Sequence, residues 1–147
     1  MAGILSTLVQ ILLWLIFTGY FPAILYRDAR LTAAILLGKS VLPPPASFDL
    51  GVLLVSILIH FSLSIVYAAM LAVMAACLKP IPIFWVGVSF GLELYMVNLY
   101  GFTEFFPWFS QARGWITLMA HEVFGVVSIS VYSWLQINSG RVEPSMH

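Results

Sequence analysis

The stretch YGFTEFFPWFSQARGWITLMAHEVFG, residues 100–125, decides how the rest of the chain can be arranged. Its first part, from Tyr100 to Trp115, holds seven Phe, Trp and Tyr side chains and a proline, and its second part is mostly apolar but carries His121 and Glu122. Trp and Tyr are enriched where a bilayer meets water. The stretch therefore predicts an interfacial connection that leads into a membrane helix with a buried histidine.

The composition of the whole chain identifies lipid as its main solvent. Of its 147 residues, 62% are hydrophobic and only 8% are charged, whereas soluble domains carry about 25% charged residues. Its apolar runs are about 20 residues long and continuous, which is the length of a membrane-spanning helix rather than of a barrel strand. We expect an all-α, polytopic membrane protein whose single domain covers residues 1–147.

Four apolar runs predict a bundle of four membrane-spanning helices. The expected ranges are 3–25, 49–77, 83–101 and 114–136, followed by a flexible tail at 138–147. Residues 31–38 are apolar but too short to span, so they predict a short interfacial helix after helix one. Pro22 is expected to bend the first helix without ending it, and Asp49 to cap the second. A tight connection is expected at Lys79–Pro82.

The distribution of basic residues gives a predicted orientation. Four spans would put both termini on one side and the first and third connections on the other. Those two connections contain four of the six basic residues, namely Arg27, Arg30, Lys39 and Arg113. Because Lys and Arg favour the cytoplasmic side, we expect cytoplasmic connections and external termini. The first apolar run has no preceding Lys or Arg and is longer than a signal-peptide core, so we expect it to be retained.

Several classes of function lack their usual sequence signals. The formal net charge is zero, without a basic run that would favour nucleic-acid binding. Cys77 is the only cysteine, which excludes an intramolecular disulfide or a thiolate metal cluster. His121-Glu122 begins like the zinc motif H-E-x-x-H, but Gly125 occupies the place of its second histidine. No nucleophile stands beside a base, so the sequence favours a protein that is not an enzyme.

Polar residues inside the expected spans form the candidate site. They are His60, Glu93, Asn98, His121 and Glu122. A charge at the bilayer centre costs about 2.5–3.5 kcal/mol, so such residues usually face protein or water. From a rise of 1.5 Å per residue, His60 lies about 16 Å, Glu93 about 12 Å and His121 about 10 Å below the same membrane face. This common depth predicts a buried polar cluster.

The spacing of small residues indicates which helix faces touch. Small and polar residues recur at every third or fourth position along two of the expected helices, and Gly87-x-x-x-Gly91 is a small-residue contact motif on a third. The two stripes are Ser56, His60, Ser64, Ala68, Ala72 and Ala76, and His121, Gly125, Ser128 and Tyr132. Each histidine is therefore expected to point toward a neighbouring helix. The same pattern also fits a network that serves packing alone.

Three functions remain open from the sequence. The first is a small transport, channel-like or accessory subunit that uses His60, Glu93 and His121. The second is a redox subunit that binds haem, a metal or a quinone through His60 and His121, although their depths differ by about 6 Å. The third is a structural subunit of a homo-oligomer or larger complex. In each case the loop with Glu104, Trp108 and Arg113 either anchors the bundle or covers the histidines.

Part of the chain resembles a known group of proteins. The residues that carry the likeness are Tyr100-Gly101-Phe102-Thr103, Phe106-Pro107-Trp108-Phe109, Arg113, Trp115 and Ala120-His121. They resemble small, uncharacterised bacterial inner membrane proteins of about four spans, some labelled "sodium:proline symporter", over about residues 37–132. The resemblance implies a bacterial inner membrane location and no catalytic residue. A symporter of the labelled type resembles a ten-helix inverted repeat, which is far longer than this chain.

Overall fold

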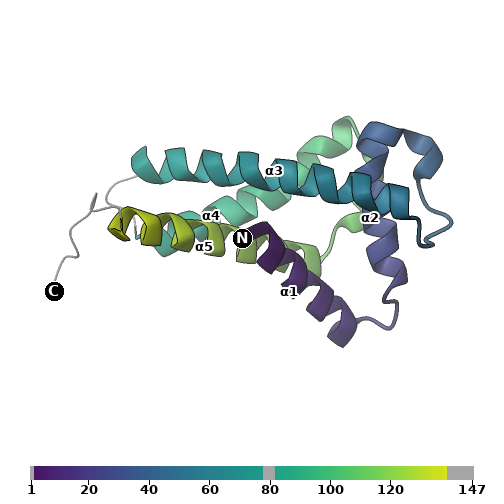
Figure 1. The fold of residues 1–147 in the computed structure, drawn as a ribbon, viewed down its shortest axis with the longest axis horizontal. Coiled ribbons are helices and arrows are strands. Elements are labelled where there is room, and N and C mark those ends of the chain that lie inside the picture. The colour runs from purple at the N-terminus through teal and green to yellow at the C-terminus, as the bar shows by residue number, and fades with distance from the viewer. Residues whose placement is uncertain (1, 78–81, 139–147) are drawn as a thin grey trace.

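The computed structural model describes residues 2–77 and 82–138 (Figure 1). All regular structure in these residues is helical, as expected. Three helical stretches are long and apolar enough to cross a membrane. They are α3 (Leu50–Cys77), α4 (Ile83–Met96) with its continuation to Glu104, and α5 (Trp115–Asn138). The expected tail beyond Asn138 and the connection before Pro82 lie outside the described residues.

The expected fourth span is not confirmed, because the first apolar run is divided. Helix α1 (Ala2–Phe17) has 16 residues, which rise about 24 Å against a bilayer core of about 30 Å. The prediction that Pro22 only bends this helix is wrong, since a new helix, α2 (Ala23–Leu37), begins directly after it. Pro22 has no amide hydrogen to continue the helical ladder, and proline suits the start of a helix.

Helix α2 lies across the end of α3 instead of running along it (Figure 1). The expected short interfacial helix at 31–38 is the second half of α2, whose first half carries Arg27, Asp28 and Arg30. Arg27 and Asp28 form an ion pair of 2.7 Å. Burial nevertheless raises the pKa of the Asp28 carboxyl, because the loss of water outweighs the attraction of the Arg27 guanidinium.

Arg30 is buried, although the sequence placed it among the residues at the membrane surface. Its guanidinium donates to the carbonyl of Val41 at 3.1 Å and to that of Ser47 at 3.3 Å. These two carbonyls flank the proline connector, which cannot form its own backbone ladder. Arg30 therefore holds the connector between α2 and α3. Helix α3 begins directly after Asp49. The Asp49 carboxylate accepts a hydrogen bond from the Val52 amide at 3.0 Å, which confirms the predicted cap.

The closest contact between helices joins α4 to α5. A Cβ atom on Gly91 would lie 2.7 Å from the His121 carbonyl oxygen and 2.8 Å from the Glu122 Cα. One on Gly125 would overlap the Gly87 carbonyl oxygen. The two backbones therefore touch, as the Gly87-x-x-x-Gly91 motif predicted. By contrast, the only buried residues of α3 are Val52 and Leu71.

Two apolar clusters lie at different levels of the bundle. One joins α3, α4 and α5 through Leu71, Val86, Phe90, Leu94, Phe124 and Ile129. The other joins α2 to the aromatic connection through Leu31, Tyr95, Leu99 and Ala112, with Trp108 packed against it. The connection itself forms two short 3₁₀ helices, Phe102–Glu104 and Pro107–Ala112. Since the Trp108 Nε1 also donates to the Leu31 carbonyl at 2.9 Å, the first and third connections meet at one end of the molecule.

The glycine contact predicts a sharp difference between two alanine substitutions. Gly125→Ala places a methyl group against the backbone of α4, so we expect it to lower the free energy of unfolding by about 1–3 kcal/mol, the usual cost of overpacking. Gly101→Ala, whose new methyl group meets nothing within 4 Å and whose backbone is helical, should leave it unchanged or raise it by up to about 1 kcal/mol. Unfolding in mixed micelles measures both. Equal effects would contradict the close contact.

Candidate functional site

The candidate site begins at a widened turn that continues α4. Residues Val97–Gly101 form a π-helical segment directly after Met96. Such turns interrupt the regular helix and occur frequently at functional sites. The segment carries Asn98, whose side chain is within hydrogen-bond reach of both α3 and α5. A local irregularity of α4 thus supplies the residue that joins three helices.

A chain of hydrogen bonds passes through Asn98. The Tyr67 hydroxyl of α3 donates to Asn98 Oδ1 at 2.6 Å. Asn98 Nδ2 lies 3.2 Å from Nε2 of His121, and Nδ1 of His121 lies 2.8 Å from the carbonyl oxygen of Thr117. The side chains of three helical elements are thereby connected in one line, from Tyr67 to the backbone of α5.

These partners define where the protons are. Because Asn98 Oδ1 accepts from Tyr67, the amide nitrogen of Asn98 faces His121 and donates to it. His121 Nε2 must then carry a lone pair, while its Nδ1 carries the hydrogen that the Thr117 carbonyl accepts. The network therefore specifies a neutral His121 protonated on Nδ1.

Tyr95 forms a wall of the site. Its ring meets the His121 ring edge-on, with centroids 5.8 Å apart. Its hydroxyl accepts from the Gly114 amide at 3.3 Å, so the same side chain fixes the start of α5. Tyr95 is buried, which separates His121 from the aromatic connection.

His60 belongs to a second polar contact, between α1 and α3. Its Nε2 lies 3.0 Å from the Thr7 hydroxyl, which donates its only hydrogen to the Gly3 carbonyl at 2.8 Å. This arrangement favours donation from His60 Nε2, the opposite tautomer to that of His121. Gly3 makes this approach possible, because a Cβ atom there would lie 2.7 Å from the Ser64 hydroxyl.

The predicted cluster is only partly assembled. The structure brings Asn98 and His121 together. His60 is exposed and contacts Thr7 of α1 instead, Glu93 is exposed, and Glu122 is half-buried on another face of its helix. Neither carboxylate forms a hydrogen bond or ion pair within residues 2–77 and 82–138. The physical reason is rotation, since consecutive residues of a helix point about 100° apart. A common depth does not imply a common face.

In the interfacial loop, Arg113 binds acceptors of the π-helical segment and of the turn after it. Arg113 and Glu104 do not pair, because Arg113 donates from Nε to the Leu99 carbonyl at 2.8 Å and from its terminal nitrogen to the Thr103 hydroxyl at 3.2 Å. Its guanidinium also lies 4.1 Å from the centre of the Tyr100 ring. Arg113 thus closes the π-helical segment, as basic side chains often do at helix ends. Glu104 remains exposed.

Four contributors to these contacts were missed in the sequence: Thr7, Tyr67, Tyr95 and Thr117. Tyr67 had a usable signal, because it follows His60 by seven residues and therefore shares its helix face. Tyr95 and Thr7 had none, since their roles depend on how distant helices cross. Thr117 contributes only its carbonyl oxygen, which any residue could supply.

The structure offers limited support for a metal or haem site. In the part of the chain that it describes, no three His, Cys, Asp or Glu residues are grouped so that they could hold a metal ion. Both ring nitrogens of His121 are engaged in hydrogen bonds. Use of His121 as a ligand would require it to leave Asn98.

Comparison with protein-family models, with curated proteins and with solved structures finds no match for this chain.

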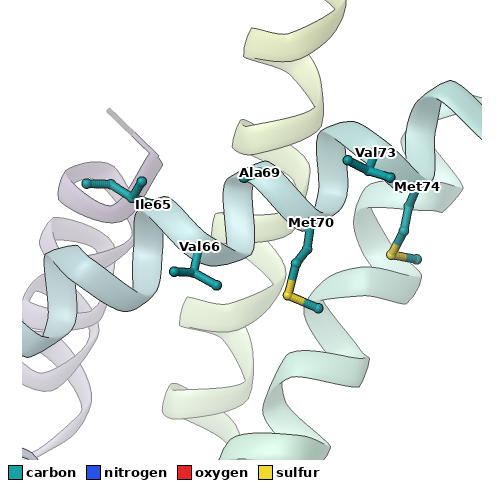
Figure 2. Close-up of a pocket in the computed structure, with 6 residues that line it drawn as sticks. All are labelled: Ile65, Val66, Ala69, Met70, Val73 and Met74. Atoms are coloured by element: carbon teal, nitrogen blue, oxygen red, sulfur yellow. The ribbon is translucent and has the colours of Figure 1, made fainter.

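An open apolar groove follows α3 but adds no chemistry to the site. It has a volume of about 610 Å³ and is lined by Ile65, Val66, Ala69, Met70, Val73 and Met74 (Figure 2). None of these side chains can exchange a proton or hold a charge. The polar chain through Asn98 is therefore the stronger candidate.

The assigned protons predict opposite tautomers for the two histidines. In ¹⁵N NMR spectra of histidine-labelled protein in micelles, we expect His121 to show the neutral Nδ1–H form and His60 the Nε2–H form. Substitution of His60 or His147 by glutamine assigns the signals. An Nε2–H form of His121 in the native protein would contradict the network.

Proposed function

We propose that this chain is a small membrane transport or channel-like subunit in which the line from Tyr67 through Asn98 to His121 handles a proton. The observation that supports the proposal is the complete set of hydrogen bonds with a single proton arrangement. Polar residues inside membrane helices are costly and commonly belong to ion or proton pathways. A network used for packing alone would need no titratable group at its centre.

The geometry suggests how protonation of His121 would rearrange the network. The lone pair on His121 Nε2 can accept a proton, after which Nε2 needs an acceptor in place of the Asn98 amide nitrogen. Rotation of the Asn98 amide would offer Oδ1 to His121 and turn Nδ2 toward the Tyr67 oxygen. The Tyr67 hydroxyl hydrogen would then point elsewhere. Protonation at one end would thus reorient the group at the other.

The side chains in contact with this line limit its charge. The Tyr95 ring packs against His121 from α4, and the Tyr67 hydroxyl of α3 joins His121 through Asn98. Because His121 is the one basic side chain among these contacts, we propose that the line carries at most one added proton at a time. That the chain lies in a bacterial inner membrane and belongs to a larger complex stays a prediction.

Proton flux into liposomes tests this function. With a potassium diffusion potential and an internal pH-sensitive dye, we expect the native protein to accelerate proton entry. His121→Ala and Asn98→Leu should reduce entry to the rate of protein-free liposomes, because either change interrupts the line. Glu104→Gln alters an exposed carboxylate of the interfacial loop and should leave the rate unchanged. Undiminished flux through folded His121→Ala would contradict the proposal.

A further inference from the structure

A second, shorter groove opens on the outer surface where α4 meets α5. It is lined by Phe84, Val88, Glu122, Val123, Val126 and Val127 and has a volume of about 350 Å³. Glu122 supplies the one ionisable side chain among these lining residues. The groove is therefore an apolar surface with a single carboxylate.

Glu122 has no counter-charge in the described residues. It is half-buried and forms no hydrogen bond or ion pair within them. It lies seven residues into α5, about 10 Å from the start of the helix. At this depth a bare carboxylate is costly, and such a residue usually has a partner. A charged Glu122 therefore needs a partner from outside this part of the chain or a bound molecule.

The helix contact makes the groove open outward. The backbones of Gly91 and Glu122 are so close that even a methyl group on Gly91 would not fit between them. No ligand can therefore pass between α4 and α5 at this level. The exposed ring of Phe84 lies at the same groove. A ligand would approach from the lipid side and meet aromatic, aliphatic and acidic groups together.

The length of the groove favours a small molecule over a partner helix. Its lining covers residues 84–88 of α4 and 122–127 of α5, which corresponds to about 6–8 Å along the helix axes. A packed helix would make contacts over several turns. Small-molecule pockets, by contrast, commonly have volumes of about 300–1,000 Å³ with few polar groups.

We propose that this groove binds hydrophobic organic cations, with Glu122 as the counter-charge and Phe84 as an aromatic wall. The carboxylate compensates the positive charge where water is scarce, so attraction is strong. The face of the Phe84 ring adds a favourable contact with a cation, and the valines accept its apolar groups. The site is independent of the proton-handling line, because no residue that lines the groove belongs to it.

Binding of tetraphenylphosphonium to protein purified in an uncharged detergent tests the proposal. Equilibrium dialysis should show saturable binding to the native chain. Glu122→Gln should weaken it by about tenfold or more, because the charge attraction is lost. Phe84→Ala should also weaken it. Glu93→Gln is the matched control, since it removes an exposed carboxylate of α4 outside the groove and should leave binding unchanged.

Four outcomes would overturn the proposal. Unchanged binding by Glu122→Gln, or an equal loss with Glu93→Gln, would mean that the cation does not use this site. Absence of saturable binding to the native chain would instead favour a basic side chain of a partner helix as the counter-charge. Triphenylphosphine oxide, a neutral molecule of similar shape, should not compete, and competition by it would show attraction to apolar surface alone. Thermal unfolding of each variant verifies that it is folded.

Discussion

The backbone contact between α4 and α5 is the constraint on which the arrangement depends. Lipid provides no hydrophobic drive for two apolar helices to associate, so close packing and hydrogen bonds must hold them. Gly87, Gly91 and Gly125 allow the backbones to touch, and this contact fixes the register of the two helices. The register brings His121 within reach of Asn98 and leaves Glu122 at the outer groove. The positions of both candidate sites therefore depend on these three glycines.

Much of the fold could be predicted because lipid leaves few choices. Continuous apolar runs located the three long helices, and Asp49 identified the start of α3. The division between α1 and α2 was missed, because a proline such as Pro22 can either kink or begin a helix and the flanking residues are apolar in both cases. Burial of Arg30 was missed as well, since its acceptors are carbonyls of a connector whose path the sequence does not specify.

The candidate site could be predicted only in outline. Helix rise gave similar depths for His60, Glu93 and His121, but by the same rise Asn98 lies only about 4–5 Å from that membrane face, so depth alone does not pair it with His121. Helix rise does not give the rotation of a helix about its own axis. For this reason Glu93 was expected inside the cluster, whereas the structure shows that it is exposed. The π-helical segment adds a further shift that no periodicity reveals. Tyr67 reaches Asn98 because it packs against the apolar cluster that joins α3 to α4 and α5.

The central claim is that Asn98 and His121 interact directly inside the membrane. A double-mutant cycle with Asn98→Leu and His121→Phe, based on unfolding free energies in mixed micelles, measures that interaction apart from the effect of each residue alone. The structure predicts a favourable coupling energy of about 0.6–1.7 kcal/mol, the range found for hydrogen bonds between membrane helices. Additive effects of the two substitutions would contradict the network and the account built on it.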